Sequence, residues 1–162
     1  MNNLLKTALA GLAFGGLGLW YLWQEPAAVL PASPLMPPDI DIAQGAELYA
    51  AGCAVCHGAN LEGQENWQTP GEDGVFLPPP HDEEGHTWHH GDELLFGYIK
   101  LGGAGAMELA GISDFKSGMP GYSETLSDSE IWNILAFIQS TWSPEVQQSQ
   151  RARSVDEQLY KE

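Results

Sequence analysis

Basic residues are scarce in this sequence. Its 162 residues include only six Lys and Arg against 22 Asp and Glu, which gives a formal net charge of −16. Nucleic-acid-binding proteins neutralise phosphates with Lys and Arg, so this composition argues against that class. The two cysteines are too few for a disulfide-rich scaffold or a four-cysteine zinc site. Apolar residues, at 43%, are nevertheless sufficient for a packed core.

Charged residues are absent from residues 7–23, which are rich in Leu, Ala and Gly. This run approaches the ~20 residues that a membrane-spanning helix needs. A cleaved secretory signal would look similar, but we favour an uncleaved anchor because aromatic residues cluster at its far end, where an interfacial belt would lie. Lys6 is the only Lys or Arg before Lys100, which predicts a cytoplasmic amino end and a periplasmic remainder.

Proline is concentrated directly after this run. Residues 24–38 hold five of the eleven prolines, and Pro-rich segments form semi-rigid extended spacers. We therefore divide the chain into a membrane anchor or signal (1–23), a Pro-rich tether (24–38), a globular domain (39–143) and a polar tail (144–162). The tail is expected to be either a short helix or disordered, and the sequence assigns it no role.

Sustained strand alternation is missing as well, so the globular domain is predicted to be all-α. A first helix is expected to place Ile42, Ala46 and Tyr49 on one face and to run into the cysteines. A second is expected from about Asp92 to Leu101, where Gly102 and Gly103 follow.

The third predicted helix is the clearest. Ser127 and Glu130 have capping-box spacing. The apolar stripe of this helix consists of Ile131, Ile134, Leu135 and Ile138.

By contrast, the segment between Gly58 and Gly91 is long, rich in Gly and Pro, and without helical periodicity. Such a loop inside a compact domain is usually functional, so we expect something other than side chains to fill the middle of the fold.

The two cysteines stand in Cys53-Ala54-Val55-Cys56-His57, the pattern of c-type haem attachment. Two thiols three residues apart on a helical turn can each add to one haem vinyl group, and the next residue presents its imidazole to the iron. The alternatives are a redox dithiol, half of a zinc site, or chance. A thioredoxin-like dithiol would stand in an α/β context, which is absent here. We therefore favour covalent haem.

The iron then has a sixth ligand or an open position. We favour Met119, because the glycines of Gly118-Met119-Pro120-Gly121 allow close backbone approach and its proline stiffens the loop. Met107 lacks such a neighbour and is interpreted as a gap-filling core residue. The remaining candidates are the histidines at 81, 86, 89 and 90.

From about Asp39 to Ser143 the chain resembles a class I cytochrome c of the membrane-anchored bacterial kind. The resemblance rests on the order of amino-terminal helix, Cys-x-x-Cys-His, long loop, middle helix, Met-Pro loop and carboxy-terminal helix. It implies three main helices and long loops around one covalent haem c, with Cys53 and Cys56 attached and His57 and Met119 as the axial iron ligands.

Two finer contacts are implied by this resemblance. The first and last helices of the family pack through a glycine against an aromatic residue, which would pair Gly45 with Trp132 or Phe137. A proline carbonyl of the family accepts a hydrogen bond from the proximal histidine. Three consecutive prolines, Pro78, Pro79 and Pro80, fall in the right region, and the sequence does not choose among them.

Four histidines and three acidic residues crowd into ten positions of the long loop: His81, Asp82, Glu83, Glu84, His86, His89 and His90. They could form a second metal site for copper or zinc, since imidazole suits both metals. The alternative, which we favour, is a solvated loop near the haem propionates.

The expected function is single-electron transfer between respiratory or photosynthetic complexes on the periplasmic side, without enzymatic activity or a small-molecule substrate. Its acidic surface predicts redox partners with basic docking patches. One alternative is a fixed cytochrome subunit of an oxidase or dehydrogenase. Another is a haem sensor with an open iron site, which would bind carbon monoxide rapidly when reduced.

Overall fold

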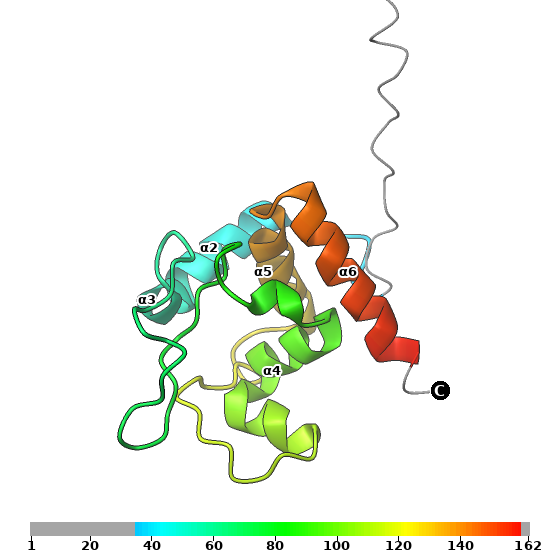
Figure 1. The fold of residues 1–162 in the computed structure, drawn as a ribbon. Coiled ribbons are helices and arrows are strands. Elements are labelled where there is room, and N and C mark those ends of the chain that lie inside the picture. The colour runs from blue at the N-terminus through cyan, green and yellow to red at the C-terminus, as the bar shows by residue number, and fades with distance from the viewer. Residues whose placement is uncertain (1–34, 160–162) are drawn as a thin grey trace, which may run out of the picture. The chain divides into compact units, whose positions relative to one another are not determined.

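The structure is a computed structural model that describes residues 35–159, and every regular element in that range is helical (Figure 1). The elements are α2 (Ile42–Gly52), α3 (Ala54–His57), the 3-10 turn η1 (Thr87–His89), α4 (Asp92–Leu109), α5 (Asp128–Ser140) and α6 (Pro144–Leu159). The all-α prediction is therefore confirmed for the described residues.

The predicted membrane anchor (1–23) and most of the predicted tether (24–38) lie outside the described residues. Within residues 35–159, no helix combines the length and the apolar character needed to cross a bilayer.

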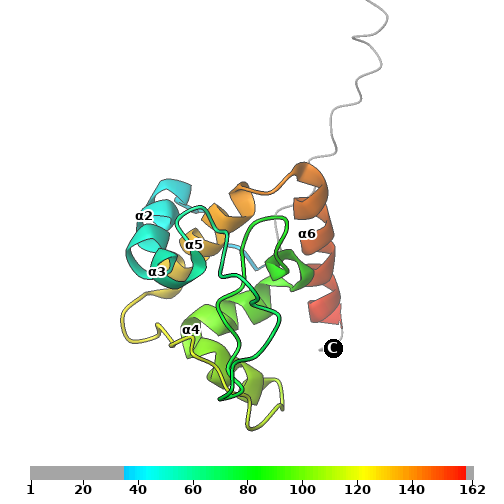
Figure 2. The same ribbon diagram turned by 60° about the vertical axis from the view of Figure 1, so that its left-hand side comes forward.

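The closest helix contact joins α2 and α5, which cross in both ribbon views (Figures 1 and 2). Gly45 makes this possible, because a Cβ atom there would lie 2.0 Å from the backbone oxygen of Asn133 and 3.1 Å from Cβ of Phe137. The contact expected for Gly45 is thus made with Phe137. Trp132 instead stacks on Phe96, with ring centroids 4.7 Å apart.

The face of α2 that enters the core agrees with the prediction at Tyr49 but not at Ile42. Gly45 and Tyr49 are buried, whereas Ile42 is 47% exposed. The reason is the glycine contact with α5, which fixes the rotation of α2 and turns its first residue toward solvent. The prediction for Ile42 was wrong, because apolar spacing alone does not register a close backbone approach.

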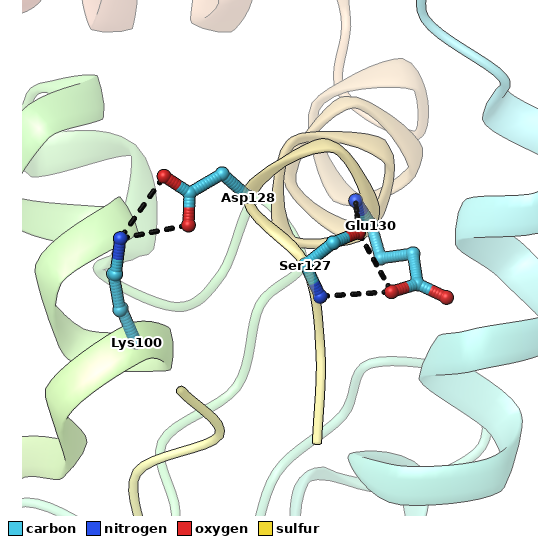
Figure 3. A network of polar contacts seen from close by, with 4 residues as sticks. All are labelled: Lys100, Ser127, Asp128 and Glu130. Atoms are coloured by element: carbon cyan, nitrogen blue, oxygen red, sulfur yellow. Dashed lines mark hydrogen bonds and ion pairs between the residues drawn. The ribbon is translucent and has the colours of Figure 1, made fainter. Parts of the chain in front are cut away.

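Helix α5 begins as predicted. The Ser127 hydroxyl accepts from the Glu130 amide, and the Glu130 carboxylate accepts from the Ser127 amide, which completes the capping box (Figure 3). Next to it, Lys100 of α4 forms an ion pair of 2.7 Å with Asp128. The predicted stripe of Ile131, Ile134, Leu135 and Ile138 is buried in the core.

Helix α4 has a break where its end was predicted. Gly102 has a φ of +75°, a left-handed conformation that interrupts the helix, and a second helical segment continues to Leu109. There is also no room for a side chain at residue 102, since a Cβ atom would lie 2.8 Å from the Met119 oxygen and 2.7 Å from the Gly121 nitrogen. The predicted stop is thus a kink that receives the Met119 loop.

The polar tail forms helix α6 in the structure, which decides between the two expected states. It packs against α4 and η1 and lies on the opposite side of the fold from α3 (Figures 1 and 2). Gln150 and Ser154 of α6 are buried, and both bond to Asp92 at the start of α4. The tail therefore has a structural role that its sequence did not indicate.

Candidate functional site

The two cysteines lie where α2 gives way to the single turn α3. The Cys53 amide donates to the Tyr49 oxygen, 2.8 Å away, and closes α2, while the Cys53 oxygen accepts from the His57 amide, 3.0 Å away. Cys53 is half-buried and Cys56 exposed, and neither is in a disulfide. Burial, assisted by the nearby Cys56, raises the pKa of the Cys53 thiol to about 11.

His57 is the most constrained residue of the motif. Its side chain is 7% exposed, and its Nδ1 lies 2.8 Å from the carbonyl oxygen of Pro79. A carbonyl only accepts, so Nδ1 carries the proton and donates it. Nε2 then has a free lone pair, and it has no hydrogen-bond partner among the described residues. Burial lowers the pKa of His57, although the Pro79 bond opposes this effect, and the neutral ring is favoured.

The structure thereby chooses Pro79 among the three candidate prolines. The chain reaches this position because two parts of the long loop run side by side. The Gly63 amide donates to the His57 oxygen at 2.8 Å, and the Gln64 amide donates to the Pro78 oxygen at 3.0 Å. Gly63 has a φ of +63°, and a Cβ atom there would lie 2.3 Å from the Pro80 nitrogen. Only glycine allows this approach.

Met119 lies on a loop bonded to the kink of α4. The Met119 oxygen accepts from the Gly103 amide at 3.2 Å, and the Tyr122 amide donates to the Ile99 oxygen at 3.0 Å. The half-buried Met119 side chain packs against the hydrophobic core. Met107 is also half-buried, but it lies on the second segment of α4 and is not part of the buried core that its interpretation as a gap-filler requires.

Tyr122 joins the Met119 loop to the cysteine motif. Its hydroxyl donates to the Gly52 oxygen, 3.1 Å away and one residue before Cys53. Burial raises the pKa of Tyr122, and the thiols of Cys53 and Cys56 add to the shift. The sequence does not indicate this bond, because it joins residues 70 positions apart.

The four loop histidines have different ring partners. His86 stacks on Trp67 with ring centroids 4.7 Å apart and meets His90 edge-on at 5.2 Å. His89 stacks on Trp88 at 3.7 Å. Among residues 35–159, no group of three or more His, Cys, Asp or Glu side chains is arranged to hold a metal ion. The described residues thus lend no support to a second metal site.

His81 takes a different place from the other three, next to His57. The two rings are stacked, with centroids 4.1 Å apart and an interplanar angle of 23°. Burial lowers the pKa of His81 to about 3, with smaller effects from His57 and His86. The sequence grouped His81 with the loop histidines and missed this contact. Its one available signal was its position directly after the three prolines.

These residues fit a covalently attached haem. Two thiols without disulfide partners flank one helical turn, and the next residue is a buried histidine whose Nδ1 proton is committed to a backbone carbonyl. The donor atom that iron would take, Nε2, is left free in its neutral form. The loop of Met119 is bonded through Tyr122 to the residue before the motif. This donor set suits iron in a haem better than zinc, which needs further ligands that the described residues do not bring together.

Comparison with known proteins agrees with this geometry. The family model described as cytochrome c matches residues 42–142. A thiosulfate dehydrogenase from Stutzerimonas stutzeri (strain A1501) is 30% identical over 122 residues, which are 74% of this chain and 34% of that protein. The chain thus spans about a third of the length of this curated relative. No solved structure matches the chain.

Proposed function

The chain belongs to the cytochrome c family, and from this premise we propose that it is a membrane-tethered electron carrier with one haem on the periplasmic side. Covalently bound haem c is the cofactor of this family, and Cys53, Cys56 and His57 form its attachment motif. When bound, haem c supplies a one-electron Fe³⁺/Fe²⁺ couple.

The bond from His57 to the Pro79 oxygen, at 2.8 Å, is the observation that carries the proposal. It fixes the tautomer that leaves Nε2 as the iron ligand, and it raises the basicity of the ring. We assign the sixth position to Met119, whose loop is bonded to the kink of α4 and, through Tyr122, to Gly52. Compared with a second imidazole, a thioether ligand in that position raises the reduction potential of the iron.

With His57 and Met119 both bound, no position is open to a small molecule, so the site transfers electrons and does not bind gases. Absorption spectra of both redox states, with and without carbon monoxide, test this assignment. We expect the reduced wild type to bind carbon monoxide slowly and incompletely, Met119→Ala to bind it rapidly, and Met107→Ala to behave as the wild type. Rapid binding by the wild type would exclude Met119 as a ligand. A haem stain after denaturing electrophoresis tests covalent attachment.

The charge distribution supports partners with basic docking patches. Residues 35–159 hold four Lys and Arg residues, and the two outside α6 are both hydrogen-bonded within the fold. Lys100 pairs with Asp128, and Lys116 donates to the Asp73 backbone oxygen. We expect electron transfer to the physiological partner to slow as salt rises, because screening weakens the attraction. A rate independent of salt would contradict this prediction.

The second candidate is a fixed cytochrome module of a larger dehydrogenase or oxidase. It is favoured by the relative named a thiosulfate dehydrogenase, of which this chain spans only about a third. Membrane fractionation and mild detergent extraction of the full-length chain separate the two candidates. A carrier is expected in the membrane fraction and then as a single chain in detergent. Stoichiometric co-purification with other subunits would favour the fixed module, and recovery in the soluble fraction would contradict the membrane tether.

A further inference from the structure

The ring of His57 is restrained on its face as well as at its edge. Rotation about the bond from Cβ to an aromatic ring is broad, so a single hydrogen bond at Nδ1 leaves a range of ring orientations. His81 lies against that face, 4.1 Å away between centroids and tilted by 23°. Turning the His57 ring would drive its edge into the His81 ring. The stack therefore narrows the rotation that the Pro79 bond leaves open.

His81 is itself rigidly held through its side chain. Its Nδ1 lies 2.7 Å from the Thr87 Oγ1, and the Thr87 hydroxyl donates to the Pro80 oxygen at 3.3 Å. A hydroxyl has one proton, so once it is given to Pro80 the Thr87 oxygen accepts from His81. The Nδ1 proton of His81 is thereby fixed. Thr87 is 6% exposed, so water does not compete freely for these bonds.

The backbone of His81 is also bonded on both sides. Its amide donates to the Leu61 oxygen at 2.7 Å. Its carbonyl accepts from the Trp142 indole nitrogen at 2.7 Å, and Trp142, which is 3% exposed, directly follows the cap of α5. Tyr49 of α2 meets the His81 ring edge-on at 6.1 Å. These contacts tie the position of His81 to both helices of the central pair.

We propose that His81 is a positioning residue that sets the rotation of the His57 imidazole and, through it, the reduction potential of the haem. The inference rests on the proposed function, since His57 must be the iron ligand. Residues that orient a ligating histidine act on the metal without touching it, because ring orientation governs the overlap of the nitrogen with the iron orbitals. The potential responds to such contacts and to the polarity of the surroundings.

Two substitutions separate the stack from the polarity of His81. His81→Phe retains an aromatic face against His57 but loses the bond to Thr87, whereas His81→Leu loses both. His89→Leu is the matched control, because His89 lies in the same loop, is exposed, and stacks on Trp88 at 3.7 Å instead. All are made in the full-length, haem-loaded protein.

The first measurement is the pattern of haem methyl shifts in the proton NMR spectrum of the ferric protein, which reports the plane of the axial imidazole. We expect His81→Leu to change the order and spread of these shifts, and His81→Phe and His89→Leu to keep the wild-type pattern. The second is the potential. We expect the reduction potential of His81→Leu to differ from that of His81→Phe, which is also apolar but retains the stack, by about tenfold in the equilibrium constant, or 59 mV for one electron.

A wild-type shift pattern in His81→Leu, or the same altered pattern in His89→Leu, would overturn the proposal. If His81→Leu does not retain haem, Thr87→Val carries the test, since it frees the His81 ring to turn while leaving it in place. We expect Thr87→Val to change the haem methyl shifts in the same direction as His81→Leu, but by a smaller amount. An unchanged shift pattern in Thr87→Val would overturn the proposal. A wild type without covalent haem would instead refute the proposed function, so the two failures are distinguishable.

Discussion

Helices α2 and α5 meet through a glycine, whereas α4 and α6 meet through buried polar groups. At the first contact, the absent side chain of Gly45 brings α2 against the backbone of Asn133. At the second, Oδ1 of the fully buried Asp92 in α4 accepts from the side-chain amide of Gln150 in α6 at 2.7 Å, and it also accepts from that of Gln139 in α5 at 2.7 Å. The first contact depends on shape and the second on hydrogen-bond partners.

This difference teaches where each region tolerates change. In the α2–α5 contact the backbones are in direct contact, so a larger side chain at Gly45 cannot be accommodated without moving the helices apart. In the α4–α6 contact the space is filled by long side chains, and the requirement is that each buried donor finds an acceptor. The first supports the cysteine motif, which directly follows α2. The second supports the start of α4, whose kink at Gly102 receives the Met119 loop.

Enlarging Gly45 is expected to cause the largest loss. In Gly45→Val the new side chain would overlap the Asn133 backbone and Cβ of Phe137. We expect the free energy of unfolding, measured by urea denaturation of the haem-loaded protein, to fall by about 3 kcal/mol or more. Gly97→Ala in α4 is the control, since its nearest neighbour would be Ala106 at 4.0 Å, and it should be neutral or stabilising. Equal losses in both variants would show that shape does not govern the α2–α5 contact.

Removing the acceptor at Asp92 is expected to have an intermediate effect. Asp92→Ala leaves the amides of Gln139 and Gln150 without the oxygen they share. We expect the same denaturation measurement to show a loss of about 2 kcal/mol, because the Gln139 amide loses its acceptor and Gln150 keeps only its longer bonds to the His90 oxygen and the Ser154 hydroxyl. Asp92→Asn retains an acceptor and should lose clearly less. A loss in Asp92→Asn as large as in Asp92→Ala would contradict an interaction based on hydrogen-bond partners.

The sequence predicts those parts of the molecule whose signal is local. The capping box at Ser127 and the apolar stripe of α5 depend on residues within a few positions of one another, and both are confirmed. The position of the break at Gly102 was predicted because glycine marks helix ends, but it was predicted as a stop and the structure has a kink there. The second segment of α4, beyond that kink, was not predicted, because the kink forms against the distant Met119 loop.

The cysteine motif was found because its chemistry needs a fixed spacing, and the family match and cofactor agree with it. The sequence does not predict three contacts of the site: the bond from His57 to Pro79, the stack of His81 on His57, and the bond from Tyr122 to Gly52. Each joins residues far apart in the chain or selects one of several equivalent neighbours. The role of α6 was missed for a related reason, because its inner face is polar and carries no hydrophobic pattern.

The smallest expected effect is a pH dependence at the α4–α6 contact. Burial raises the pKa of Glu157 above its ordinary value of 4.5, and Glu93 adds to the shift, although the bond from the Gly91 amide to Oε1 of Glu157, 3.0 Å away, opposes it. A raised pKa in the folded state means that the native protein binds the proton more tightly than the unfolded chain. The stabilisation is complete below the ordinary value and is lost as pH rises through the folded value.

Glu157→Gln removes this titration. We therefore expect the difference in free energy of unfolding, variant minus wild type, to increase as pH is raised from about 4 to about 7, by a small amount because the side chain is only half-buried. Asp156→Asn, on the exposed side of α6, is the control and should give a difference that varies less with pH. A difference that stays constant in Glu157→Gln would mean that the carboxylate at the start of α4 is as well solvated in the folded protein as in the unfolded chain. The α4–α6 contact would then depend on Asp92 and its partners Gln150 and Ser154, without a contribution from Glu157.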